Sequence, residues 1–560
     1  MNSYPPPFAL KRATRCAMFC PVVAPCCEAS QAEQKPEVVV AEAPADSSWQ
    51  IEIASIPSDA SVWQAEGEDA AQEKMMSMRT RRSVRSGASV QSILSVTLAD
   101  ESLLRATDIR SVLSGFGKYL QAHSLIDHAL TVEKASALFQ KSREVDTIEY
   151  FISHCWNDGR LSKVCALWIH SNLRGAVCSS MMVGCTAAGL TALKVLPVNE
   201  SVVVKGFQVF PWALLLGSIS FFMGLCFWHL LPSLGSRRRY FFDKFCVHQA
   251  EPGRKNLAVM SFAAFVTRSQ KLLLLWSPSY FTRLWCTLEV AALVKSKGSD
   301  CEPLPLEFLP LQLAKVSCSS WLIFSLLYLL VQMARQLNFI TIILDLCVTG
   351  VMTVTALYLM VATLREYARA RQDLGEQILR FSIADAECSR LEDRMRVQRT
   401  VLHWFKGLQE CNQHVREKVH DQILETLGPD KHYPTTLLLP IFAIDFWNEL
   451  DYLAAEYHLT EGATKITIWI GWSGFMCTLI PISYRLCRQF TVKRGSIAQE
   501  ILLNLALMTV VSVYSVTSYF VIRIFLYYKF IPIWVGMGIA LGEWLLLCWL
   551  QRASCPSRRR

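Results

Sequence analysis

The stretch KLLLLWSPSYFTRLWCTLEVAALVKSK, residues 271–297, decides the fold expected for the soluble part of this chain. Residues 271–276 form a short apolar run, which the turn formers at 277–279 close, and this is typical of a strand buried on both faces. A helix is expected at once afterwards, with Gly298 as its stop, because apolar residues recur at spacings of three and four. The residues of this stripe are Phe281, Leu284, Leu288 and Ala292.

Two further runs, residues 148–152 and 240–246, are rich in β-formers, and helix-forming sequence follows each of them. This alternation predicts an α/β domain with a parallel sheet and crossover helices. Folds of this class bind ligands at the carboxyl ends of their strands. The residues expected at those ends are Ser153, His154 and Trp156, residues 243–249, and residues 277–280.

Three blocks carry a family resemblance: FISHCW at 151–156, FFDKFCVHQ at 241–249 and SPSYFTRLWCTLE at 277–289. Together they resemble a Toll/interleukin-1 receptor (TIR) domain, in the divergent form seen in protists such as dinoflagellates. The resemblance implies a flavodoxin-like parallel sheet and signalling by association of domains. In TIR domains that cleave NAD, a glutamate on the helix after the WC pair is catalytic, and the matching position is Glu289. Many other members only bind partners.

The chemistry of Glu289 is also argued without the family. Trp285 and Glu289 are four residues apart on a helix and share a face, so a carboxylate lies beside an aromatic wall. Cleavage of an N-glycosidic bond builds oxocarbenium charge on the ribose, which a fixed carboxylate stabilises. The alternative is a solvated Glu289 and a core Trp285, and both interpretations stay open. The residues expected to line an NAD pocket are Ser153, Trp156, Asp243 and Trp285, with NAD as substrate and no cofactor or metal.

The composition predicts a multi-pass membrane protein. The chain has 560 residues, 52% of them hydrophobic, which is too apolar for an ordinary soluble protein. Its net charge of +9 includes the Lys and Arg residues that usually flank membrane spans, so no nucleic-acid partner is inferred. The expected partners are membrane lipid and further copies of the chain. No apolar signal-peptide core begins the sequence, so the N-terminus and the TIR-like domain are expected on the cytosolic side.

The expected organisation is a TIR-like domain interrupted by a membrane hairpin, followed by an α-helical transmembrane bundle. Its parts are a disordered arm (1–102), a helical lead-in (103–145), the TIR-like domain (146–174 and 237–315), a hairpin of two spans (175–236), a second hairpin (316–364), a charged cytosolic helical region (365–432), a re-entrant or interfacial segment (433–463), about three spans (464–550) and a basic tail (551–560). The charged region is equally consistent with a coiled-coil stalk and with a helical cap on the TIR-like domain.

The number of spans is left at seven or eight. Seven crossings place the arginines at 558–560 outside, against the positive-inside tendency, whereas a weak crossing near 435–446 resolves the conflict. Each of the first two predicted spans, 175–193 and 207–236, is long enough to cross a hydrocarbon core of about 30 Å. Because two crossings return the chain to its starting side, the two halves of the interrupted domain can meet.

Two functions follow as hypotheses. The first is signalling through self-association of the TIR-like domain, with NAD hydrolysis at Glu289 as its enzymatic form. The second is an ion channel or transporter with a regulatory TIR-like domain, which depends on the number of spans and on the acids Asp345 and Glu543 within them. No selectivity-filter motif, Walker loop, HExxH or Gly-x-Ser-x-Gly motif occurs in the sequence.

Overall fold

The computed structural model describes residues 94, 97, 98 and 100–552 with several gaps. The gaps are 122–130, 198–209, 232–237, 298–303, 337–341, 389, 428–433, 435–436, 438, 456–458, 494 and 520–531. Nearly all of the predicted arm at 1–102 and most of the basic tail at 551–560 therefore lie outside the described residues. The described residues belong to one of the chain's two compact units, Ser83–Arg560.

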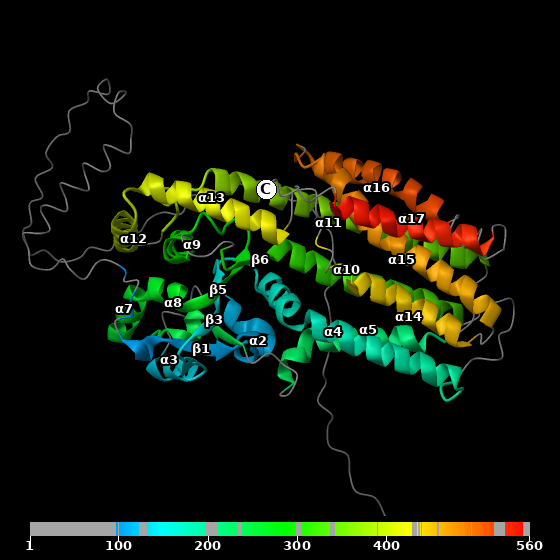
Figure 1. Cartoon of the computed structure of the whole chain (residues 1–560), viewed down its shortest axis with the longest axis horizontal. Coiled ribbons are helices and arrows are strands. Elements are labelled where there is room, and N and C mark those ends of the chain that lie inside the picture. Colours follow the sequence, from blue (N-terminus) through cyan, green and yellow to red (C-terminus); the bar gives the residue numbers. More distant parts are fainter. Residues whose placement is uncertain are drawn as a thin grey trace, which may run out of the picture. The chain divides into compact units, whose positions relative to one another are not determined.

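Within the described residues, six strands form one mixed sheet in the order β2-β1-β4-β3-β5-β6 (Figure 1). The strands are β1 Arg105–Asp108, β2 Arg143–Glu144, β3 Ile148–His154, β4 Arg239–Phe241, β5 Ser269–Trp276 and β6 Leu306–Pro310. Strands β4, β3, β5 and β6 are parallel, whereas β1 pairs antiparallel with both β2 and β4. The purely parallel sheet expected from the sequence is thus wrong at this edge.

Two differences from the predicted elements have local causes. The lead-in at 103–145 was expected to be helical, but it contains the strands β1 and β2 as well as helices. The sequence does not predict these strands, because they are too short to show an alternating pattern. The run at 240–246 is not one strand: β4 ends at Phe241, and helix α6, Asp243–Cys246, begins with an acidic residue in its first turn. Asp243 is therefore at the start of a helix beyond the strand end.

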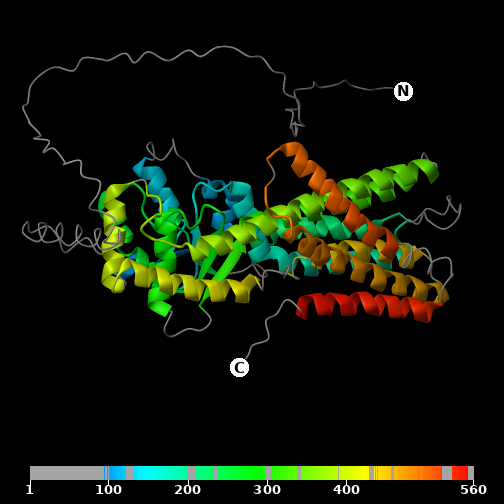
Figure 2. The ribbon, with the colours of Figure 1, turned by 90° about the horizontal axis from the view of Figure 1, so that it is seen from above.

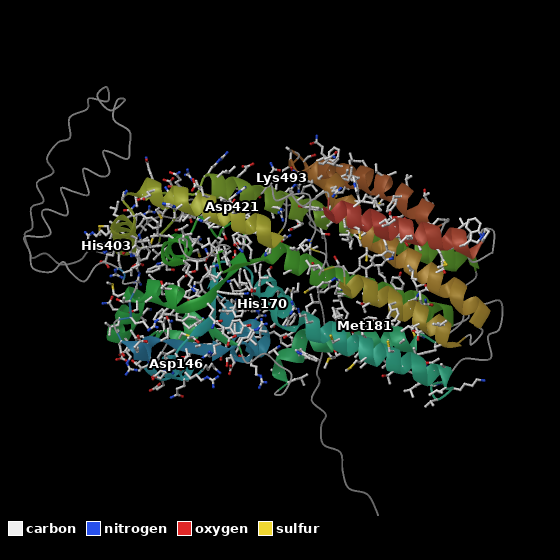
Figure 3. The ribbon with its side chains drawn as sticks, viewed as in Figure 1. Asp146, His170, Met181, His403, Asp421 and Lys493 are labelled. Atoms are coloured by element: carbon white, nitrogen blue, oxygen red, sulfur yellow. The ribbon has the colours of Figure 1, made fainter. Side chains whose placement is uncertain are left out.

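Strand β5 is buried on both faces, as its continuous apolar run predicts. Leu272 and Leu274 belong to one hydrophobic cluster, while Leu273 and Leu275 belong to another on the opposite face. His170 packs against Tyr150 of β3, on the face of the sheet that carries Leu273 and Leu275, with ring centroids 5.0 Å apart (Figure 3). Helices and short turns cover these faces: η2 Glu101–Leu103, α2 Ile109–Gly117, η3 Lys118–Leu120, α3 Val132–Phe139, α7 Pro252–Met260, α8 Phe262–Arg268 and α9 Leu284–Lys297.

Helix α4, Arg160–Ala192, joins two elements that the sequence separated. The predicted soluble helix and the predicted span at 175–193 are one continuous helix of 33 residues. Gly175 does not end it; instead, the absence of a side chain there admits Trp228, since an added Cβ would lie 2.1 Å from the indole. Helix α4 packs along α5, Trp212–Phe227, and Gly224 of α5 closely approaches Ala176.

The remaining helices form the largely apolar part of the chain. They are α10 Leu311–Gln336, α11 Ile342–Leu379, α14 Leu439–Ala455, α15 Leu459–Arg488, α16 Ile497–Tyr519 and α17 Ile533–Arg552. Trp447 of α14 packs where α4 and α5 carry Gly184 and Gly217. Asp451 of α14 accepts hydrogen bonds from the backbone N–H groups of Ala213 and Leu214, at 2.7 and 2.9 Å, at the start of α5.

Among the described residues, four helices are long and apolar enough to cross a membrane. They cover Arg160–Ala192, Trp212–Leu230, Leu311–Met333 and Ile497–Thr517, and Trp534–Trp549 is a shorter apolar helix. These helices are compatible with a membrane protein. The seven or eight spans, and the cytosolic side of the N-terminus, stay predictions. The side chain of Asp345 on α11 lies outside the described residues.

The charged region at 365–432 is helical and packs on the sheet domain. It contains the second half of α11, then α12 Leu391–Trp404 and α13 Leu408–Leu427. Both α12 and α13 contact α9, and α13 also contacts β6. Leu374 and Ile378 of α11 enter the same hydrophobic cluster as the strands. These contacts are those of a helical cap. The chain enters the cap along α11, a single helix of 38 residues (Figure 2).

Candidate functional site

A cavity of about 390 Å³ lies at the carboxyl ends of β3 and β4, beside the first turns of α9. Parallel strands end at this edge, and the helices that follow them begin here, which is the usual place for ligands in such sheets. Its walls include Trp156 and Asp243, which follow β3 and β4, and Trp285 and Glu289 from α9. Four of the five site residues expected from the sequence therefore line one cavity.

Ser153 is the exception, because it contacts the site from behind. It is the penultimate residue of β3, it is fully buried, and it does not line the cavity. Its hydroxyl donates a hydrogen bond to Glu289 Oε2 and also hydrogen-bonds the hydroxyl of Tyr280. Since a hydroxyl has one proton, Tyr280 is then the donor to Ser153. Ser153 thus orients the carboxyl group of Glu289, rather than forming a wall for a ligand.

Glu289 is a buried carboxyl group. It lies on the second turn of α9, and only 8% of the residue is exposed. Burial raises the pKa of Glu289 to about 8; the Ser153 hydrogen bond opposes this shift, and the charge of Asp243 adds to it. The carboxyl group is therefore mostly neutral at pH 7. The solvated carboxylate that the sequence left open as an alternative does not describe this residue.

Asp243 and Trp156 form a hydrogen-bonded pair across two strands. The indole Nε1 of Trp156 donates to Asp243 Oδ2 at 3.1 Å, and the backbone N–H of Lys244 donates to Asp243 Oδ1 at 2.7 Å. Burial raises the pKa of Asp243 to about 6, and these two hydrogen bonds limit the rise. At pH 7 Asp243 is therefore mostly charged while Glu289 is mostly neutral. Two acids with separated pKa values are the arrangement from which acid and base roles are assigned in enzymes.

Aromatic rings line the cavity beside these acids. Trp285 packs edge-on against Phe262, with ring centroids 5.7 Å apart. Trp156 packs against His154 in the same way at 4.5 Å, and the cation of Lys244 lies 5.1 Å from the Trp156 ring. His154 is buried, its Nε2 atom has no hydrogen-bond partner among the described residues, and burial lowers its pKa well below the ordinary value. It is therefore a neutral wall residue.

One wall of the cavity was missed by the sequence analysis. Residues 381–394 are called the cap segment below; they comprise most of the connection between α11 and α12 and the first turn of α12. They contribute Glu387, Cys388, Arg390 and Asp393 to the lining. Glu387 pairs with the loop before α9: its carboxylate lies 3.3 Å from Arg283, and its backbone forms an isolated bridge there. No local signal points to this contact, because it joins segments about a hundred residues apart.

The arrangement suits a ligand with a flat ring and a positive charge. Trp156 and Trp285 line the cavity with aromatic rings, and Asp243, which is mostly charged at pH 7, provides negative charge within the same cavity. The cavity volume lies within the range of roughly 300–1,000 Å³ common for small-molecule sites. Among the residues that the structure describes, no cluster of three or more His, Cys, Asp or Glu side chains has metal-binding geometry.

No family model matches the chain, and no curated protein or solved structure matches it either.

Proposed function

We propose that this chain is a membrane-anchored signalling protein that acts through a TIR-like α/β domain, and that the domain hydrolyses NAD with Glu289 as its catalytic residue. The observation that carries the proposal is the position of Glu289, a buried carboxyl group at the wall of a cavity lined by Trp156 and Trp285. The three sequence blocks that resemble the family supply Trp156, Asp243 and Glu289, and these residues line one cavity.

The proposed reaction breaks the bond between the nicotinamide nitrogen and C1′ of the ribose. The electron pair leaves with nicotinamide, and the positive charge that remains spreads over the ribose as an oxocarbenium ion. Bound NAD brings a positively charged ring next to Glu289, and this charge lowers the pKa of the carboxyl group. Glu289 then releases its proton to solvent, and the resulting carboxylate stabilises the developing cation. Water adds to C1′, Asp243 accepts a proton from it, and ADP-ribose is formed.

NAD consumption by the purified, detergent-solubilised full chain tests this proposal. The wild type is expected to consume NAD at high protein concentration, and Glu289→Ala is expected to lose that activity. Glu133→Ala is the matched control, because Glu133 is an exposed glutamate on α3, outside the cavity. Equal consumption by the wild type and Glu289→Ala would contradict the assignment of Glu289. No consumption by any variant, with the protein folded and self-associated, would contradict the enzymatic part of the proposal.

Association of TIR-like domains from several copies is the second part of the proposal. A membrane anchor favours this association, because confinement to a membrane raises the local concentration of the domains. The activity per molecule is expected to rise with protein concentration and to fall on dilution. An activity per molecule that is independent of concentration over the range in which the oligomer dissociates would contradict this part.

A second candidate function is transport, with the α/β domain as a regulator. The observation that favours it is Glu543 on α17, an acid within an apolar helix. Its Oε2 atom accepts hydrogen bonds from the hydroxyls of Tyr514, at 2.8 Å, and Thr478, at 3.1 Å, so three helices meet at this carboxyl group. Ion flux into liposomes that contain the full chain tests this candidate. Glu543→Gln should abolish the flux, whereas Glu289→Ala should leave it unchanged.

A further inference from the structure

The cap segment is a fixed wall of the cavity. The backbone N–H of Glu387 donates to the carbonyl of Thr282 at 2.6 Å, and the N–H of Leu284 donates to the carbonyl of Glu387 at 3.1 Å. Within the segment, the guanidinium of Arg394 donates hydrogen bonds to the carbonyls of Ala384 and Ala386, at 2.7 and 2.8 Å. A segment tied by backbone pairing to the loop that starts α9 has a defined position beside Glu289.

The cap segment is also held from its other side. The backbone N–H of Ile383 donates to Asn412 Oδ1 on α13 at 3.1 Å, and Arg416 of α13 donates to the carbonyl of Phe381 at 2.8 Å. Phe381 packs edge-on against Phe281, with ring centroids 5.9 Å apart. The backbone of the cap segment is therefore held from two directions, and this fixes the position from which its side chains reach the cavity.

Arg390 is the unpaired charge at this wall. Glu387 is paired with Arg283 at 3.3 Å, and Asp393 is paired with Arg396 at 3.8 Å. Arg390 lines the same cavity, its side chain is exposed, and it makes no ion pair with any residue that the structure describes. Guanidinium groups bind phosphates through two parallel hydrogen bonds, which gives both charge and direction to such a contact.

We propose that Arg390 binds the phosphate groups of the nucleotide whose ribose is placed beside Glu289, so that the cap segment is part of the ligand site. The inference rests on the proposed function for the nature of the ligand. In the proposed arrangement the nicotinamide ribose lies beside Glu289, so the pyrophosphate lies further along the cavity wall. Arg390 is the residue of the cap segment that lines the cavity with a positive charge outside any ion pair among the described residues. In this proposal the binding site is built from the α/β domain together with the segment that follows α11.

The test is equilibrium binding of ADP-ribose to the detergent-solubilised full chain, measured by calorimetry, for the wild type and three variants. Arg390→Gln is expected to weaken binding at least tenfold, and Arg390→Lys, which keeps the charge but loses the paired hydrogen bonds, is expected to lie between. Arg380→Gln is the matched control, since Arg380 is exposed just before the cap segment and lines a separate cavity. An exposed arginine is removed with little effect on folding.

The outcomes separate this inference from the proposed function. Unchanged affinity in Arg390→Gln, an equal loss in Arg380→Gln, or no binding by the wild type would overturn the role of Arg390. If the wild type but not Glu289→Ala consumes NAD, and the ADP-ribose affinity is unaltered in Arg390→Gln, Glu289 stays the catalytic residue and Arg390 is removed from the site. Binding that depends on Arg390, without any NAD consumption, keeps the phosphate site and removes the hydrolase. The wild-type affinity should also fall as salt increases.

Discussion

Glu289→Gln is expected to stabilise the sheet domain at pH 8 and to leave its stability nearly unchanged near pH 4. Glutamine has almost the shape of glutamic acid, and its amide oxygen can still accept the hydrogen bond from Ser153. Only the ionisation of the side chain is removed. The comparison therefore isolates the cost of keeping a carboxyl group neutral inside the protein at a pH at which the unfolded chain would ionise it.

The sign and size of the effect follow from the two pKa values. The folded state holds Glu289 at a pKa of about 8 against an ordinary value of 4.5, so between these values the folded state binds the proton and the unfolded state does not. Stability contributed by this group is present below pH 4.5 and is lost as the pH rises toward 8. A difference of 8 − 4.5 = 3.5 pKa units, at about 1.36 kcal/mol each, gives a loss of about 5 kcal/mol in the wild type.

Hydrogen exchange followed by mass spectrometry measures this loss where it occurs. Peptides from β3 and β5 report the opening of the sheet independently of the apolar helices. At each pH between 4 and 9, the exchange of Glu289→Gln is compared with that of the wild type at the same pH. The protection factor of Glu289→Gln divided by that of the wild type should grow with pH, by about tenfold for each 1.4 kcal/mol of stability that the wild type loses. Glu133→Gln, an exposed substitution on α3, serves as the control. A ratio that stays constant from pH 4 to pH 9 would refute the view that Glu289 is buried as a neutral acid.

Two further substitutions test the packing around the site and among the apolar helices. Ser153→Ala removes the donor to Glu289 and should destabilise the sheet domain by about 1–3 kcal/mol. It should also raise the pKa of Glu289 further, because the hydrogen bond from Ser153 lowers that pKa. Hydrogen exchange as a function of pH measures both effects, and unchanged protection would contradict them. Gly184→Ala places a Cβ 2.5 Å from the ring of Trp447 and should cost about 1–3 kcal/mol in thermal stability; Gly538→Ala, where nothing lies within 4 Å, is the control, and equal melting temperatures would contradict the close approach.

The sequence predicted the elements that depend on local patterns. The apolar run at β5, its closing turn and the helix after it are read from a few neighbouring residues, and the structure has them at nearly the expected positions. The single buried stripe expected of that helix is wrong, because α9 is buried at every position from Cys286 to Val294 and Phe281 lies before its start. The same pattern placed Trp285 and Glu289 on one helical face, and both line the cavity. The short strands β1 and β2 were missed, because strands of four and two residues are stabilised by their neighbours and not by their own composition.

For the candidate site, sequence and structure divide according to the range of the interactions. Residue spacing alone determined that a carboxylate and an indole lie side by side on α9, because a helix turns once every 3.6 residues. Only the tertiary structure decided that Ser153 lies behind Glu289 rather than in the cavity, that burial keeps Glu289 mostly neutral at pH 7, and that the cap segment forms the remaining wall. Burial and pairing between distant segments depend on how the whole chain packs, and no window of neighbouring residues contains that information.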